Sequence, residues 1–484
     1  MHALAEVALQ YAERELKADN ATSARPGPAT LPGIYGVFQD FLQLLMGRKE
    51  PASAGEQIAR GTAGLFASRI CFTGLMFLVS VILARLLSSG GYGAYTYALA
   101  WVVLLGVPGI LGTDQLLVRE LAVYRTRGAW DLIRGSIRQA NAAVLVASLA
   151  LAAGAALVAK VVLSSRGGQS QAVFWVALIL LPLITLTRVR QAALRGLNIL
   201  VLGQLPETIV QPSMFLILLA AAYWRLGKHL TATWAIGTNV VATAVAFVVG
   251  ALLLRTYLPE AAKGAKPTYP DWGWLRSALP LMFLSSVAVI YGQADVLILG
   301  AIKGAKAVGV YGAADRGAGL LAFLFTAAIS AMAPTIASLY ASGDQQALQR
   351  MVTKLVRVTL ALTLPVAVAF IGFGYWVLLW LYGADYVAGQ RALAILSVGQ
   401  LVNVAMGPVG MLLIMTGHEK DATWSIGISA VVNVGLNFAL VPKWGLEGAA
   451  ISAASSMVLW NCLMARAVHK RFGIHSTVLG KISF

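Results

Sequence analysis

The stretch LARLLSSGGYGAYTYALA, residues 83–100, leaves an apolar run, crosses small and polar residues, and enters a new apolar run behind a Gly-x-Tyr triplet. The stretch LGAIKGAKAVGVYGAADR, residues 299–316, has the same order of features. Gly93 of the first stretch corresponds to Gly309 of the second, and we call their separation along the chain the repeat spacing. This pairing suggests that the chain contains the same structural unit twice.

A second pair of similar motifs supports the duplication. The motif ALRGLN surrounds Gly196, and the motif IMTGHEK surrounds Gly417. The separation of these two glycines differs from the repeat spacing by only five residues. A register kept over that length of chain predicts an internal repeat.

Composition indicates what kind of unit is repeated. Of 484 residues, 58% are hydrophobic and 12% are charged, whereas soluble domains carry about 25% charged residues. Apolar runs of roughly 18 residues or more, enough for a helix to cross about 30 Å of hydrocarbon, recur along the chain. The 48 glycines favour close packing between such helices. The predicted fold class is therefore an all-α polytopic membrane protein.

The apolar runs predict twelve membrane-spanning helices, six in each half. An even number means that both halves enter the membrane from the same side, so an axis along the membrane normal should relate them. The expected spans are 61–87, 95–117, 140–163, 172–187, 206–223, 231–254, 277–302, 310–340, 358–380, 392–415, 423–440 and 445–465. The expected domains are a cytoplasmic tail with amphipathic helices at 1–60, an N-lobe at 61–256, a cytoplasmic linker at 257–276, a C-lobe at 277–471 and a cytoplasmic tail at 472–484.

The distribution of lysine and arginine predicts the orientation. If the N-terminus is cytoplasmic, about 26 of the 37 basic residues fall on the inner side and about 8 on the outer side. This predicts a multi-pass protein of the cytoplasmic (inner) membrane with both termini in the cytoplasm. The net charge of +17 then faces anionic lipid, so the bilayer and not a nucleic acid is the expected partner.

Several features argue against an enzyme. The expected outer loops are short, the five histidines have no metal-ligand spacing, and no glycine-rich phosphate loop follows a strand pattern. We therefore expect no catalytic residues, no metal and no cofactor. Cys71 and Cys462 lie far apart within apolar runs, and no disulfide is expected.

Several stretches resemble the polysaccharide flippases, the Wzx-type transporters of the multidrug/oligosaccharidyl-lipid/polysaccharide (MOP) superfamily. The matching stretches are VILARLLSSGGYGAYTYALA, GILGTDQLLVRELA and ALRGLNILVLGQLPETIVQP in the first half, and IYGQADVLILGAIKGAKAVGVYGAADRGAGLL and KWGLEGAAISAASSMVL in the second. The resemblance covers about 61–471, and its specificity lies in the order and spacing of the motifs. The N-terminal tail departs from the usual family pattern.

The resemblance implies two pseudo-symmetric six-helix lobes around a central cavity, a MATE-like arrangement. It also implies movement of a polyprenyl-diphosphate-linked oligosaccharide across the membrane by alternating access, for O-antigen, capsule or exopolysaccharide biosynthesis. Polysaccharide polymerase or export machinery would be further partners, and coupling to an ion gradient is left open. The alternatives are a MATE-like multidrug or cation antiporter and a lipid II-type flippase.

Ionisable residues inside spans indicate the candidate site, since each costs roughly 2.5–3.5 kcal/mol at the bilayer centre. The candidates for the cavity are Arg69, Asp295, Asp315 and Arg316. Arginine forks match phosphate oxygens, so Arg69 and Arg316 would bind the diphosphate. Asp295 and Asp315 would couple transport to an ion. The alternative for all four is a structural salt bridge.

Polar residues near these charges complete the hypothesis. Amides within spans are expected to form hydrogen bonds between helices, and contact with sugar hydroxyls is the alternative; they are Gln293, Gln400, Asn403, Asn433 and Asn437. Arg188, Arg190 and Arg195 would gather the substrate at the cytoplasmic entrance, or simply follow the positive-inside rule. Glu207 is expected in the first turn of a helix that begins at Pro206.

Overall fold

The computed structural model describes residues 54–163, 169–269, 273–478 and 480. The chain divides into two units, Met1–Ala54 and Gly55–Phe484, and all that follows concerns the second. The predicted amphipathic helices of the N-terminal tail lie outside the described residues.

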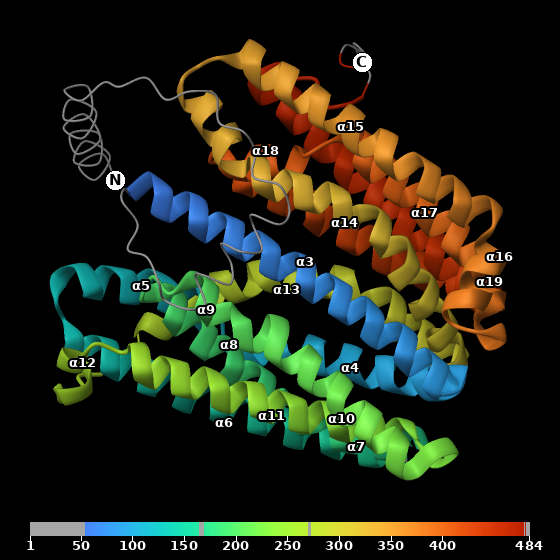
Figure 1. The fold of residues 1–484 in the computed structure, drawn as a ribbon, viewed down its shortest axis with the longest axis horizontal. Coiled ribbons are helices and arrows are strands. Elements are labelled where there is room, and N and C mark those ends of the chain that lie inside the picture. The colour runs from blue at the N-terminus through green and yellow to red at the C-terminus, as the bar shows by residue number, and fades with distance from the viewer. Residues whose placement is uncertain (1–53, 164–168, 270–272, 479, 481–484) are drawn as a thin grey trace. The chain divides into compact units, whose positions relative to one another are not determined.

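Helices make up nearly all of the described residues, which contain no strand (Figure 1). The first half contains α3 (Ala54–Leu86), α4 (Ser89–Ile110), α5 (Thr113–Arg127), α6 (Trp130–Leu163), α7 (Gln169–Leu178), α8 (Leu180–Gly196), α9 (Leu200–Leu205), the π-helical turn η2 (Pro206–Val210), α10 (Gln211–Leu226), the 3₁₀ turn η3 (Gly227–His229), α11 (Ala232–Tyr257) and α12 (Glu260–Gly264). The second half contains α13 (Gly273–Lys303), α14 (Ala305–Ala341), α15 (Gln345–Gly372), α16 (Gly374–Leu381), the 3₁₀ turn η4 (Ala384–Gly389), α17 (Gln390–Met406), α18 (Val409–Met415) and α19 (Glu419–Phe472).

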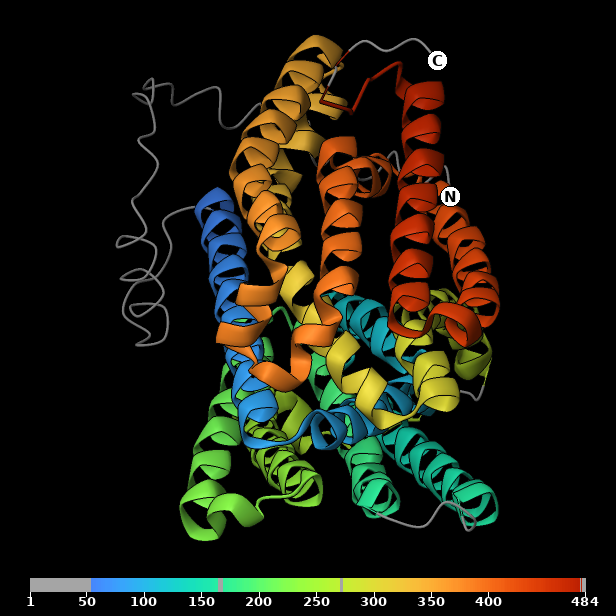
Figure 2. The same cartoon turned by 90° about the vertical axis from the view of Figure 1, so that its right-hand side faces the viewer.

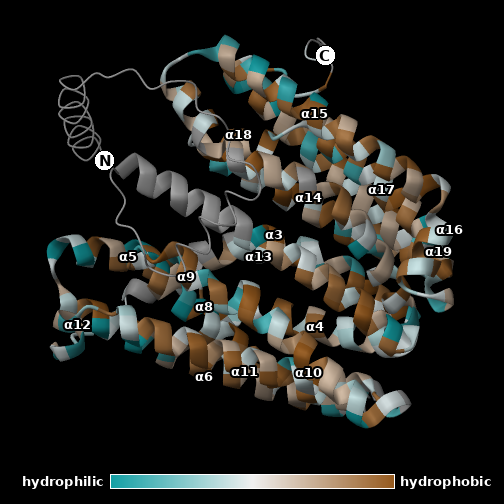
Figure 3. Ribbon diagram, in the orientation of Figure 1, coloured by the Kyte–Doolittle hydropathy of each residue, from teal (hydrophilic) through white to brown (hydrophobic). Residues whose placement is uncertain are grey.

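The apolar length of these helices fits a membrane protein. Among the described residues, nine helices are long and apolar enough to cross a bilayer, or ten if the pair Ala384–Met406 and Val409–Met415, bent by 43°, forms one span. Helix α19 covers both of the last two expected spans, and a break at Gly445, where the backbone leaves the helical conformation (φ 54°, ψ −120°), separates them. Figure 3 shows apolar residues along the lengths of the helices and hydrophilic residues near the helix ends, for example at α12. Twelve spans are consistent with this and stay a prediction.

Helix boundaries repeat between the two halves. Helices α4 and α14 begin at Ser89 and Ala305, which are separated by the repeat spacing. The beginnings of α6 and α15, at Trp130 and Gln345, keep this spacing to within one residue, and so do the ends of α11 and α19. Figure 2 shows the α4–α11 helices and the α14–α19 helices as two groups. The fold therefore has two pseudo-symmetric lobes, while their predicted boundaries stay predictions.

The two copies of the Gly-x-Tyr corner lie against each other. Helix α14 packs along α4, and a Cβ atom on Gly93 would lie 1.7 Å from the carbonyl oxygen of Ala305. Reciprocally, a Cβ atom on Gly309 would lie 2.0 Å from the carbonyl oxygen of Ser89. The absence of a side chain at each glycine thus lets the backbone of the first turn of the other helix pack directly against it. The corner occurs twice because its two copies form one symmetric contact between the lobes.

The lobes are joined near this corner by hydrogen bonds from α3. The guanidinium of Arg85 donates to the carbonyl of Leu381 at 2.9 Å and to that of Trp380. The hydroxyl of Tyr386 donates to the carbonyl of Ala84 at 3.1 Å. Together with the glycine contact, these bonds hold the two lobes together near the α3–α4 corner.

Several helix boundaries differ from the expected spans, and two of these differences affect how the helices pack. The span expected at 95–117 breaks after Ile110, because Leu111 and Gly112 take left-handed conformations (φ 57° and 68°). A Cβ atom on Gly112 would lie 2.4 Å from the carbonyl oxygen of Ala278, so the break also lets α13 approach. The fifth span runs over Leu200–Leu226 and so begins before Pro206, which places Glu207 inside a π-helical turn rather than in a first helical turn.

The second pair of motifs also needs a change of register. The left-handed residues that follow α8 and α18 are Asn198 (φ 67°) and Gly417 (φ 77°). Their separation is closer to the repeat spacing than that of Gly196 and Gly417. The structural equivalent of Gly417 is therefore Asn198, and the sequence pairing with Gly196 was off by two residues. Asparagine tolerates this conformation better than most residues. The N-lobe therefore has no glycine at this position, and a comparison of glycine positions alone cannot find the equivalence.

Candidate functional site

The carboxylate of Asp295 is the centre of a polar cluster in the C-lobe. Asp295 lies on α13, and the side-chain amides of Asn433 and Asn437 on α19 donate to its Oδ1 atom at 3.0 and 2.6 Å. The hydroxyl of Tyr311 on α14 also hydrogen-bonds this carboxylate. Asn433 donates further to Ser456 Oγ at 3.1 Å. Among the described residues, the hydrogen-bond partners of Asp295 are thus amides and a hydroxyl, so the expected interhelical amide bonds are present.

One acceptor in this cluster has no partner. The Oδ1 atom of Asn437 is buried and makes no hydrogen bond within the described part of the chain. The amide nitrogen of the same side chain is shared between Asp295 and the carbonyl oxygen of Asn433, the latter at 2.9 Å. A buried unpaired acceptor beside a carboxylate leaves excess negative potential, and oxygen atoms of this kind suit a hard cation or a proton.

The N-lobe contains a neutral counterpart of this cluster. Tyr95 has in the first Gly-x-Tyr corner the place that Tyr311 has in the second, and its hydroxyl accepts a hydrogen bond from Asn239 Nδ2 at 3.0 Å. Gln211 Nε2 donates to Asn239 Oδ1 at 2.9 Å, so both ends of that amide are paired. The tyrosine of each corner therefore anchors a polar cluster, and the C-lobe cluster carries the carboxylate.

Helix α14 presents two opposite charges at adjacent positions. The side chains of Asp315 and Arg316 are exposed, although the neighbouring Ala314 and Gly317 are buried. Successive residues of a helix project about 100° apart. Both charges lie within electrostatic range of Tyr92 on the N-lobe helix α4 and of Tyr382, which follows α16 in the C-lobe, and Asp315 also acts on Asp295. Arg316 thus brings a cation to the contact between the lobes.

The remaining cavity candidates are less closely connected. Arg69 is exposed on α3, where Thr73 Oγ1 donates to its carbonyl oxygen at 3.0 Å. No contact among the described residues ties the Arg69 guanidinium to Asp295 or Arg316. Gln293 is half-buried on α13 without a hydrogen bond to any described residue.

Gln400 and Asn403 belong to a chain of amides between α17 and α19. Asn403 Nδ2 donates to Gln400 Oε1 at 3.3 Å, and Asn461 Nδ2 donates to Asn403 Oδ1 at 3.0 Å. Sequence reasoning missed Asn461, whose position as a buried amide within an apolar run was the available signal. These bonds between helices are one of the two roles expected for the amides, and contact with a sugar stays a prediction.

The three arginines expected at an entrance have different surroundings. Arg190 Nη1 donates to the carbonyl of Phe247 at 2.7 Å, and its guanidinium carbon lies 3.2 Å from the centre of the Phe247 ring, which fastens α8 to α11. Arg188 and Arg195 interact electrostatically with Glu207. The Oε1 atom of Glu207 and the Nε atom of Arg195 are buried without hydrogen-bond partners in the described residues. Sequence reasoning did not connect Glu207 with these arginines, because the π-helical turn that reorients it was not expected.

Comparison with known proteins assigns this architecture. Residues 58–340 match the family described as polysaccharide biosynthesis protein. The chain belongs to this family. Residues 280–439 also match the MatE family. The resemblance found in the sequence is therefore confirmed over more than half of the chain.

Relatives and solved structures agree with this placement. "Probable flippase AglR" of Haloferax volcanii is 26% identical over 421 residues, which cover 86% of this chain and 84% of the relative. A multidrug resistance MATE family transporter of the MOP superfamily, in its inward-facing conformation, superposes with a TM-score of 0.62 at 16% identity, covering 90% of this chain and 98% of that one. The lipid II flippase MurJ, in an inward closed conformation, gives a TM-score of 0.64 at 13% identity, covering 84% and 87%. The family member described here is thus a multi-pass membrane protein with the fold of MOP transporters.

Proposed function

We propose that this protein is a flippase that moves a polyprenyl-diphosphate-linked oligosaccharide across the cytoplasmic membrane for surface polysaccharide biosynthesis. Its family and the name of its relative AglR support a flippase. The structural observation that carries the proposal is Arg316, an exposed cation on α14 where this helix packs along α4 of the other lobe. A guanidinium at the contact between two lobes can bind a diphosphate through paired hydrogen bonds.

The architecture supports movement by alternating access. The polyprenyl tail stays in lipid, while the charged diphosphate and the sugars need a polar path between the lobes. Repeats related by an axis along the membrane normal rock against each other as largely rigid bodies. The contact of Gly93 with Gly309 would be one of the surfaces that separate when that end opens. Both termini are proposed to lie in the cytoplasm.

Ion coupling would use the Asp295 cluster. The Asp295 carboxylate and the unpaired Oδ1 atom of Asn437 lie in the same cluster, because the Asn437 amide nitrogen donates to Asp295. No lysine or arginine among the described residues pairs with this carboxylate. A proton or a monovalent cation bound there would neutralise the carboxylate. Tyr311 on α14 is part of the same cluster. Binding of an ion at Asp295 would therefore change the contacts of α14, the helix that also carries Arg316.

The proposal predicts the effect of reversing one charge. In a strain that lacks this protein and any redundant exporter, lipid-linked glycan should accumulate on the cytoplasmic side, and the wild-type chain should restore export. Arg316→Glu should fail to restore export, because it repels the diphosphate, whereas Arg316→Lys should restore part of it. Export is measured as surface polysaccharide, and accumulation by mass spectrometry of extracted lipid-linked glycan. Normal surface polysaccharide in the deletion strain would refute the flippase.

A cation or drug antiporter is the second candidate, favoured by the MatE match and the acidic cluster. It predicts that the same deletion changes drug tolerance and leaves lipid-linked glycan unchanged. Measuring both quantities in one strain separates the two functions.

A further inference from the structure

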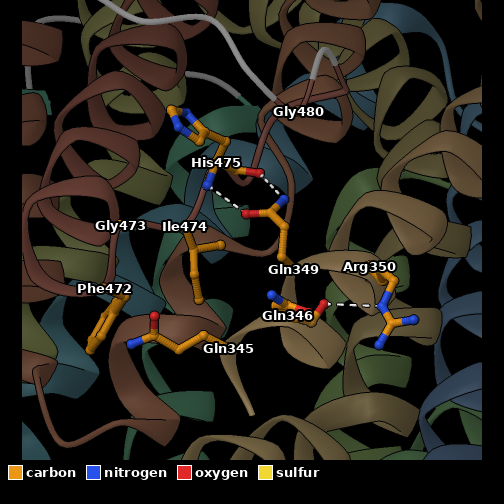
Figure 4. Close-up of a pocket in the computed structure, with 9 residues that line it drawn as sticks. All are labelled: Gln345, Gln346, Gln349, Arg350, Phe472, Gly473, Ile474, His475 and Gly480. Atoms are coloured by element: carbon orange, nitrogen blue, oxygen red, sulfur yellow. Dashed lines mark hydrogen bonds between the residues drawn. The ribbon is translucent and has the colours of Figure 1, made fainter. Parts of the chain in front are cut away.

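Two hollows lie side by side along the first half of α15 and share one residue, Arg350. The first, of about 510 Å³, is the more polar of the two, and we call it the polar pocket; three glutamines of α15 (Gln345, Gln346 and Gln349) line it together with Phe472 and the segment that follows α19 (Figure 4). The second, of about 620 Å³, is mainly apolar, and its walls include Met332 of α14 and Met351, Lys354, Leu355 and Val358 of α15. An amphiphile with an anionic group between a polar head and an apolar tail would match this sequence of surfaces.

The wall of the polar pocket is held in place without using Arg350. Gln349 Nε2 donates to the carbonyl of His475 at 2.7 Å, and the His475 backbone N–H donates to Gln349 Oε1 at 2.8 Å, a closed pair of bonds visible in Figure 4. Arg350 is exposed and makes one long bond, from Nε to the Gln346 carbonyl at 3.4 Å. Lys354, also exposed, forms no ion pair within the described residues.

The equivalent cation in the N-lobe has a structural role instead. Arg134 on α6 precedes Arg350 by the repeat spacing, and its Nη1 atom donates to the carbonyl of Ala265 at 2.6 Å and to that of Lys263. The segment after α11 therefore covers Arg134. In the C-lobe, Gln349 holds the corresponding segment after α19, which leaves Arg350 available. Both lobes therefore have an arginine at this position, but only Arg134 of the N-lobe holds a neighbouring segment in place, and Arg350 of the C-lobe does not.

The order of these surfaces along α15 also fits the membrane. The polar pocket is lined by residues at the beginning of α15. The apolar groove extends from Arg350 to Val358, which lies about 12 Å further along the helix axis at a rise of 1.5 Å per residue. The lysine and arginine distribution predicts that α15 begins at the cytoplasmic surface. Head, phosphate and tail would then lie at the depths that they occupy in the inner leaflet.

We infer that this double hollow is a docking site for the lipid-linked oligosaccharide, with sugars in the polar pocket, the diphosphate at Arg350 and Lys354, and the first isoprene units in the groove. This inference rests on the proposed function, of which it names the loading site. The polar and apolar parts commit the site to a polyprenyl diphosphate carrier rather than to free diphosphate.

The test is a binding measurement on the purified full-length protein in nanodiscs, with a long-chain polyprenyl diphosphate as the probe. The double variant Arg350→Ala/Lys354→Ala should bind the probe at least about tenfold more weakly, since two charge-assisted contacts are lost. Arg127→Ala/Arg255→Ala, which also removes two exposed cations from the N-lobe, should bind as the wild type does. Arg350→Lys/Lys354→Arg should recover most of the affinity.

Competition identifies the occupant. Inorganic diphosphate should displace the probe weakly, because it lacks the tail, and phosphatidylglycerol should displace it weakly, because it has a single phosphate and no isoprene units. Equal loss of affinity in the two double variants would show a general charge effect and overturn the inference. Equal displacement by phosphatidylglycerol would assign the hollow to ordinary lipid and overturn it as well.

The outcomes also separate this inference from the proposed function. If the wild type binds the probe and the deletion strain accumulates lipid-linked glycan, but Arg350→Ala/Lys354→Ala binds normally, the docking site is wrong and the flippase stands. If the deletion strain accumulates no glycan, the proposed function fails whatever the binding data show.

Discussion

Gly93→Val is expected to prevent stable association of the two lobes. A Cβ atom at this position would lie 1.7 Å from the carbonyl oxygen of Ala305, and that oxygen belongs to backbone that cannot rotate away. Helices α4 and α14 would have to move apart along their contact. Overpacking typically costs about 1–3 kcal/mol, and a backbone obstacle places this substitution at the upper end of that range. We expect loss of the monodisperse protein, or a large drop in its melting temperature, measured by fluorescence-detected size-exclusion chromatography after heating.

Two further variants test whether the contact is responsible. Gly309→Val should have the same effect, because its Cβ atom would meet the carbonyl oxygen of Ser89 at 2.0 Å. Gly319→Ala lies on the same helix α14 with nothing within 4 Å of the added Cβ atom, and it should be neutral. If Gly93→Val and Gly319→Ala melted at the same temperature, the reciprocal contact would not hold the lobes.

Asp295→Asn is expected to abolish ion-driven transport while leaving the protein folded. The substitution keeps the size of the side chain and an oxygen that can accept from Asn433 and Asn437. It removes the negative charge, and with it the reason for a cation or proton to occupy the cluster beside the unpaired Asn437 Oδ1 atom. In proteoliposomes with an imposed sodium or proton gradient, translocation of a fluorescent lipid-linked sugar should lose its dependence on that gradient.

A carboxylate outside the Asp295 cluster provides the control. Asp421 contacts Arg471 at 3.1 Å on the surface of the C-lobe, and exposed pairs of this kind contribute only about 0–1 kcal/mol. Asp421→Asn should therefore leave transport and its gradient dependence intact. Gradient-dependent transport by Asp295→Asn at the wild-type rate would remove the cluster from the coupling mechanism.

Much of the fold could be predicted from the sequence, because membrane helices carry their signal locally. The apolar runs and the two Gly-x-Tyr corners predicted the helical class and the repeat, and the helix beginnings at Ser89 and Ala305 keep the predicted repeat spacing. The breaks were harder to predict. Leu111 adopts a left-handed conformation that its side chain disfavours, and it does so where α13 approaches Gly112 closely.

The candidate site was predicted in part. Asp295 stood out as a charge within an apolar run, and the amides of Asn433 and Asn437 were expected to bond between helices, as they do. Neither Tyr311 nor Asn461 was recognised, because a tyrosine or asparagine in a span does not reveal its partner. Arg350 and Lys354 are among the basic residues that the predicted orientation places on the inner side, and this rule explains their presence but not the hollows beside them.

The sequence by itself determined that the helices lie in a membrane and that the chain contains an internal repeat. Both conclusions follow from patterns that can be read along the chain, namely the length of the apolar runs and the recurrence of the motifs. The tertiary structure alone decided which polar groups meet. Asp295 and Asn437 are far apart in the sequence, and Gly93 and Ala305 belong to different lobes. In each case the contact depends on how two helices lie across one another, and apolar faces of similar composition allow many such arrangements until packing selects one.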